Sequence, residues 1–135
     1  MKGNGASNDI LSFVLNSAPI SWGGAESLYV ALHTGDPGAN GLQSTREATY
    51  KNYERAAVVR SKDGWIVSGN AAKNAVLIRF PMCAGGACDV THISVGIAKS
   101  GPGRIVYTGP LSAPLGISKS IEPLFPEGSL VLTEQ

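Results

Sequence analysis

The residues best suited to chemistry are His33 and His92, because imidazole is the usual general base near neutral pH. His33 ends the segment LYVALH, and the residues TGDPG follow it. A hydrolase would need an imidazole beside a nucleophile and an orienting group, and no serine here lies in a Gly-x-Ser-x-Gly turn. The residues Asp36-Pro37-Gly38 are typical of a tight turn. We therefore interpret both histidines as structural and predict no catalytic residue.

The two cysteines, Cys83 and Cys88, enclose Ala-Gly-Gly-Ala, which suits a flexible hairpin tip. Two reduced thiols are the first interpretation, and a Cys83–Cys88 disulfide, adding about 2 kcal/mol in the chain-entropy model, is the second. A zinc site would need four ligands, and only the two histidines could complete it. Gly101-Pro102-Gly103 lacks the lysine and the helix of a phosphate-binding loop. We predict no metal ion and no cofactor.

The charge of the chain argues against several classes of partner. Its 135 residues include 11 basic and 10 acidic ones, for a net charge of +1, so electrostatics predict neither nucleic-acid nor membrane binding. No run approaches the roughly 18 apolar residues of a membrane span. Residues 1–9 lack the apolar middle region of a secretory signal, so we expect synthesis in the cytoplasm. Charged residues are only 16% of the chain, which favours a surface packed against neighbouring proteins.

One helix is predicted, over residues 7–16. Ser7 or Asn8 is suited to cap it, because these side chains accept hydrogen bonds from the first turn. Pro19 ends it. An apolar stripe at helical spacing predicts that the helix packs over one end of a sheet. The stripe consists of Ile10, Leu11, Val14 and Leu15.

The rest of the chain predicts β-structure. Glycine and proline separate short apolar or alternating segments, which is typical of a sandwich or barrel. We expect an all-β, single-domain antiparallel β-sandwich resembling a jelly roll, spanning residues 7–135 with the helix, after a flexible arm at 1–6. The polar stretch 39–52 lacks periodicity and predicts a long surface loop. The predicted strands are 27–32, 54–60, 65–67, 75–80, 90–98, 104–108, 118–121 and 129–133.

Four short motifs follow one another along the chain. They are Tyr29-x-Ala31-Leu32-x-Thr34-x-Asp36-Pro37, Glu47 before Tyr53-x-Arg55, Val90-Thr91-His92 before Gly96-Ile97, and Gly109-x-Leu111. In these residues the chain resembles a family of small virion proteins of tailed bacteriophages, described as head decoration (cement) proteins or as tail-fibre proteins. The likeness spans roughly residues 7–133. The chain departs from the family pattern in two places. The residues from Glu47 to Asn52, which precede Tyr53-x-Arg55, differ from those of the family. In the third motif, Ile93-Ser94-Val95 makes the spacing between His92 and Gly96 longer.

The resemblance implies a structural virion protein without enzymatic activity. Its expected partners are the major capsid protein, which it would decorate and stabilise on the capsid surface, and further copies of itself as a dimer or trimer. A tail, fibre or baseplate component is the alternative, and a small hydrolase or carbohydrate-binding module is a third. The loop 39–52 and the arm 1–6 would contact the capsid. The candidate contact residues are Lys2, Asn4, Gln43, Arg46, Glu47, Tyr50 and Lys51.

Overall fold

One helix and nine strands are present in the structure, a computed structural model that describes residues 1–134. The helix α1 spans Asn4–Asn16. The strands are β1 (Ser27–His33), β2 (Ala56–Val59), β3 (Trp65–Ser68), β4 (Ala71–Asn74), β5 (Ile78–Arg79), β6 (Cys88–Gly96), β7 (Ile105–Ile117), β8 (Leu124–Phe125) and β9 (Val131–Thr133).

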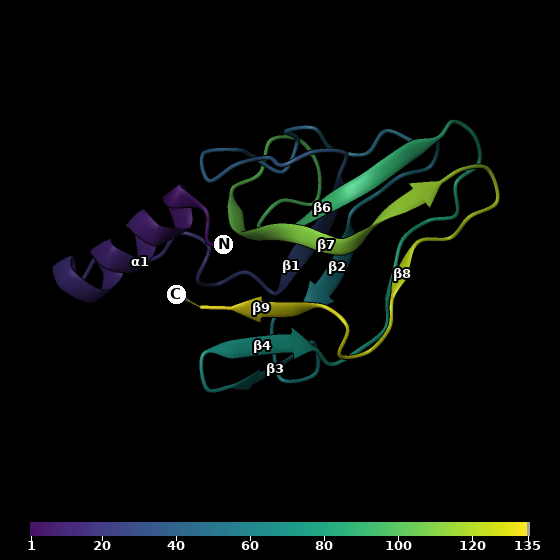
Figure 1. Ribbon diagram of the computed structural model, residues 1–135. Helices are drawn as coiled ribbons and strands as arrows, with labels where there is room; N and C mark the ends of the chain where they lie inside the picture. Colours follow the sequence, from purple (N-terminus) through teal and green to yellow (C-terminus); the bar gives the residue numbers. More distant parts are fainter. Residues whose placement is uncertain (135) are drawn as a thin grey trace.

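The strands form three antiparallel sheets, which Figure 1 shows with α1 projecting from them. The largest sheet has the order β2-β1-β6-β7, the second has the order β3-β4-β9, and β5 pairs with β8. One apolar core is built from buried side chains of the first and third sheets, with Trp65 and Leu132 of the second packed against it. The prediction of an all-β single domain with a short N-terminal helix is confirmed. The central core residues include Val30, Leu32, Val58, Ile78, Phe80, Val90, Ile93, Val95 and Ile117.

Of the strand predicted at 75–80, only Ile78–Arg79 (β5) forms, and β4, which was not predicted, ends just before this range at Asn74. The cause is the fully buried Asn74, whose amide nitrogen donates to the carbonyls of Val76 (2.7 Å) and Pro126 (2.9 Å). Its side-chain oxygen accepts from the backbone nitrogen of Leu130 at 2.9 Å. These bonds satisfy backbone groups that a continuous ladder would have used, so the chain turns here.

Strand β7 runs to Ile117, although the sequence predicts its end at Thr108. Pro110 would normally interrupt a strand, because it lacks a backbone N–H. Here Pro110 pairs with His92 of β6, and Thr108, two residues earlier, directs its own N–H outward to the carbonyl of Met1 at 2.8 Å. The missing N–H of Pro110 therefore falls on the outer edge of the sheet and costs no ladder bond. The strand predicted at 118–121 does not form, and β8 follows instead.

The first residues of the chain are docked, which corrects the prediction of a flexible arm at 1–6. Lys2 forms a β-bridge with Tyr107, and the N–H of Gly3 donates to the carbonyl of Val106 at 2.9 Å. A Cβ at Gly3 would lie 2.3 Å from the carbonyl oxygen of Ile105, so only glycine allows this approach. Helix α1 consequently starts at Asn4, with Gly3 as its N-cap, and neither Ser7 nor Asn8 caps it.

The apolar stripe of α1 does not pack over a sheet, contrary to the prediction. Leu11, Val14 and Leu15 are 59%, 66% and 74% exposed, and Ala6 is the one helix residue within 1–134 that is buried. The side of α1 that faces the rest of the fold is held by polar contacts. The carboxylate of Asp9 accepts a hydrogen bond from Trp22 Nε1 at 2.8 Å and forms an ion pair with Arg104. The stripe therefore faces away from the sheets.

The segment 39–52 contains no strand, but it is not a solvated surface loop. Gln43, Ala48 and Tyr50 are buried. The N–H of Ala48 donates to the carbonyl of Leu32 at 2.8 Å, and a β-bridge joins Glu47 to His33. The segment thus covers the end of β1 and delivers polar side chains into the interior.

Candidate functional site

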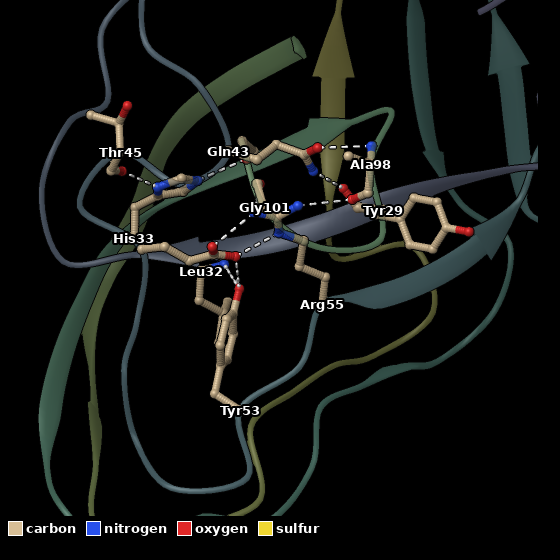
Figure 2. A network of polar contacts seen from close by, with 11 residues as sticks. Tyr29, Leu32, His33, Gln43, Thr45, Tyr53, Arg55, Ala98 and Gly101 are labelled. Atoms are coloured by element: carbon tan, nitrogen blue, oxygen red, sulfur yellow. Dashed lines mark hydrogen bonds and ion pairs between the residues drawn. The ribbon is translucent and has the colours of Figure 1, made fainter. Parts of the chain in front are cut away.

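The most concentrated polar network centres on Glu47, which forms a β-bridge with His33 at the end of β1. Figure 2 shows its partners Tyr53 and Arg55 beside Leu32. Arg55 donates to both oxygens of Glu47, from Nε to Oε2 at 2.7 Å and from Nη2 to Oε1 at 2.9 Å. The hydroxyl of Tyr53 donates to Oε2 at 2.6 Å and accepts from the backbone N–H of Leu32. The side chains of Arg55 and Glu47 are only 2% and 16% exposed, so this bidentate pair lies out of water.

Arg55 also holds the loop that follows β6. Its Nη1 donates to the carbonyl of Ala98 at 2.9 Å, and Nη2 donates to the carbonyl of Gly101 at 2.5 Å. Burial by itself would lower the pKa of Arg55, but the hydrogen bonds and charge of Glu47 outweigh it and raise that pKa. Burial and the bond to Glu47 raise the pKa of Tyr53. The network therefore keeps Arg55 charged and Tyr53 neutral at neutral pH.

Gln43 fastens the same loop from the other side of β1, and it is fully buried. Its Nε2 donates to the carbonyl of Tyr29 at 3.1 Å, and its Oε1 accepts from the N–H of Ala98 at 2.9 Å (Figure 2). A Cβ at Gly96 would lie 2.2 Å from Gln43 Cδ, so the third motif needs glycine at this position. The prediction that Gln43 contacts a capsid is wrong, because its side chain is enclosed.

His33 pairs with Ser94, a combination that sequence reasoning missed. His33 Nδ1 lies 2.7 Å from the carbonyl oxygen of Thr45, and Nε2 lies 2.7 Å from Ser94 Oγ. A carbonyl only accepts, so Nδ1 carries the proton and Nε2 accepts from the serine hydroxyl. Both residues are 0% exposed. Their proximity depends on the register between β1 and β6, which brings Ala31 opposite Ser94 and which no local motif encodes.

The His33–Ser94 pair has the distance of a base and its nucleophile, but the third partner differs from that of a catalytic triad. The group on Nδ1 is a carbonyl, whereas an orienting carboxylate would stabilise a protonated imidazole. Burial is the main cause that lowers the pKa of His33, so the ring is neutral near pH 7. His92 is half-buried, and its Nδ1 lies 2.8 Å from the Oγ1 of the neighbouring Thr91.

Acidification is expected to destabilise the fold through His33. Its pKa is lowered in the folded state, so the unfolded chain binds the proton more readily, and stability falls as the pH drops below about 6.5. The free energy of unfolding, measured by urea titration at pH 7.5, 6.5 and 5.5, should fall along this series. The His33→Asn variant should start less stable but lose less stability over the same range. An equal loss in both proteins would contradict this role of His33.

The remaining predicted contact residues do not form one site. Tyr50 is buried, and its hydroxyl donates to the carbonyl of Pro81 at 2.7 Å, so its predicted capsid contact is wrong. Glu47 is paired with Arg55, and its side chain is 16% exposed. Lys2 pairs with Glu134. Asn4 is exposed and bonds the side chain of Asn40. Arg46 and Lys51 are exposed, and they stay predictions.

The two cysteines are free thiols in the structure. Cys83 is buried, with Sγ 3.2 Å from the carbonyl oxygen of Gly85. Cys88 lies on β6, and burial is the main cause that raises its pKa. A raised pKa disfavours the thiolate that metal binding and disulfide exchange require.

The feature that no internal contact explains is the α1 apolar face, which we define as Leu11, Val14 and Leu15. Their spacing of three and four residues places them on one side of the helix. The neighbouring Phe13 is 55% exposed as well. Sequence reasoning found these residues but assigned them to the core. Their exposure makes the face the strongest candidate for contact with another protein.

Two further findings bear on the kind of site. Within residues 1–134, no helix has both the length and the apolar character that crossing a membrane requires. Over the same range, no three side chains of His, Cys, Asp or Glu gather as ligands for a metal ion.

Comparison with known proteins gives one match over nearly the whole chain. The family model described as Podophage GP4 fiber I protein gp80 matches residues 3–133. A search of curated proteins finds no match. The matched range includes all four sequence motifs, the Glu47 network and the α1 apolar face.

Proposed function

The chain belongs to the family described as Podophage GP4 fiber I protein gp80, and from this premise we propose that it is a structural subunit of a virion fibre. The predicted resemblance to small virion proteins of tailed bacteriophages is confirmed by this membership. The protein is thus a structural virion protein of a fibre-related family. The family's description supports placing the protein in a fibre.

The observation that carries the proposal is the α1 apolar face on a projecting helix (Figure 1). Three large apolar side chains on one helical face are costly to leave in water, at about 1.5–3 kcal/mol for each fully buried side chain relative to an exposed one. A subunit that is built into a larger assembly recovers this free energy when the face is covered.

Capsid decoration is the second candidate, and one observation favours it. A cement protein bridges neighbouring coat subunits, so it needs a second contact surface. Exposed apolar side chains also gather beside the paired strands β5 and β8, where Leu77, Met82 and Leu124 are 46%, 51% and 42% exposed. This surface lies on a different part of the fold from α1.

We also propose that the protein acts without catalysis. The buried pair of Ser94 and His33 has no exposed surface through which to meet a substrate. A hydrolase that used this pair would need at least one of the two groups at a surface.

The location of the protein on the particle tests the proposal. Electron microscopy of intact virions should be compared with particles grown without this chain. The expected result is that density for the all-β domain disappears from a fibre attached near the tail, with few copies per particle. Loss of density at hundreds of sites on the head would overturn the fibre assignment and support capsid decoration.

A further inference from the structure

A second apolar surface lies between the two larger sheets. We refer to it as the β2–β3 groove. It has a volume of about 630 Å³ and is lined by Leu28, Trp65, Val67, Val95 and Leu132, with further contributions from neighbouring residues. Leu28 and Val95 belong to the four-stranded sheet, whereas the other three belong to β3 and β9. The groove is therefore an opening into the space between two packed sheets.

The lining of the groove is unusually exposed for its composition. Val67 and Ile66 are 73% and 43% exposed. Trp65 Nε1 is buried without a hydrogen-bond partner among residues 1–134. A volume of roughly 300–1,000 Å³ is typical of sites that enclose a drug-sized apolar group, so the side chains of one helical turn fit this space.

We propose that the β2–β3 groove receives the α1 apolar face of a second copy of this chain. The proposal deepens the fibre function above by naming the partner of that face, and it rests on that function for the premise that copies lie side by side. Within residues 1–134, the α1 apolar face has no partner and the β2–β3 groove has no occupant. Joining them between copies removes both surfaces from water at once.

The charges of the two surfaces are complementary. The last turn of α1 has no basic residue, so its terminal carbonyls leave a partial negative charge at the end that carries Leu15. The groove is bordered by Lys62 and by Arg60, whose guanidinium also donates to the carbonyls of Gly23 and Ala25. The one acidic residue of α1, Asp9, is turned to the body and paired with Arg104. The face that enters the groove therefore carries no charge that would have to be desolvated.

The small size of the contact favours a closed ring over a simple pair. Stable interfaces bury at least about 1,200 Å² in total, and a face of three or four side chains provides less than this in a single contact. The helix and the groove are different surfaces, so the contact is heterologous. In a closed ring every copy both donates a helix and receives one, and each copy is held by two contacts.

Purified full-length protein tests this with two charge-inserting variants, Leu15→Glu in the helix and Val67→Glu in the groove. Light scattering coupled to size-exclusion chromatography, over a range of concentrations, should show a closed oligomer for the unmodified chain. Each variant alone should assemble about 30-fold more weakly or worse, as expected for loss of a central contact residue. A mixture of the two should form a dimer of one copy each, because one intact helix then meets one intact groove.

Matched controls place the same charge beside each surface. Asn16→Glu on the helix and Val76→Glu outside the groove should both assemble like the unmodified chain. Circular dichroism and thermal unfolding show that each variant is folded. Normal assembly of Val67→Glu would overturn the proposal and indicate helix-to-helix bundling, and a monomeric unmodified chain at all concentrations would overturn it as well. Because this measurement uses no virions, it fails or succeeds independently of where the protein lies on the particle.

Discussion

Replacing Glu47 with glutamine is expected to lower the free energy of unfolding by about 3–5 kcal/mol, because removing one partner of a buried ion pair leaves an uncompensated charge. The exposed fraction of the Arg55 side chain is only 2%, so water cannot replace the lost carboxylate. The hydroxyl of Tyr53 loses its strongest acceptor in the same step. Thermal unfolding should show a melting temperature lower by roughly 10–20 °C.

Glu54→Gln is the matched control for this prediction. Glu54 lies next to Arg55 in the chain, but it is exposed, and the same substitution there should change stability by no more than about 0.5 kcal/mol. A second variant separates charge from packing, since Glu47→Gln combined with Arg55→Met removes both charges and should recover part of the loss. Equal melting temperatures for Glu47→Gln and Glu54→Gln would show that the network contributes little to stability.

Truncating Leu32 to alanine is expected to cost about 2–5 kcal/mol, because a fully buried leucine leaves a cavity that the surroundings fill only in part. Leu32 is 0% exposed, and it lies in β1 between the neighbouring strands β2 and β6. Urea denaturation should show a lower midpoint with an unchanged slope, since the amount of surface exposed on unfolding is nearly the same.

Leu11→Ala is the comparison that makes this result informative. The sequence predicts both leucines in the core, but Leu11 is 59% exposed on α1. The substitution there should change stability by about 0.5 kcal/mol or less, measured in dilute protein so that copies do not associate. A loss as large as that of Leu32→Ala would mean that the helix packs on the body after all.

The strands were largely predictable because their apolar alternation and their turn residues are local signals. Ser27–His33 and Cys88–Gly96 lie within one or two residues of the predicted ranges. Strand ends that depend on distant groups were not predictable. Asn74 ends a strand through hydrogen bonds to Pro126 and Leu130, which lie more than fifty positions away. The residues near Asn74 in the sequence do not indicate these hydrogen bonds.

Helical periodicity located α1 but not its orientation. The stripe that includes Leu11 and Leu15 reveals that one face is apolar, and this pattern is the same whether the face meets its own sheet or another molecule. What turns the face outward is Asp9, held by Trp22 and Arg104. That interaction joins residues 95 positions apart, so periodicity could not reveal it.

The candidate site was also predictable only in part. The order of Glu47, Tyr53 and Arg55 was recognised as part of a motif, and the structure brings exactly these three side chains into contact. Gln43 and Tyr50 were assigned to a surface loop, because a segment without periodicity usually lies in solvent. Their burial follows from hydrogen bonds to Ala98 and Pro81, which only the folded chain brings near.

The docking of the first residues onto β7 has a consequence for the kinetics of folding. Met1 and Thr108 are hydrogen-bonded to each other although they lie 107 positions apart in the sequence. Contacts at such a sequence separation are characteristic of slow-folding proteins with high contact order. The edge of β7 cannot receive residues 1–3 until nearly the whole chain has been synthesised. Helix α1 begins at the very next residue, so its final position is among the last features to be set.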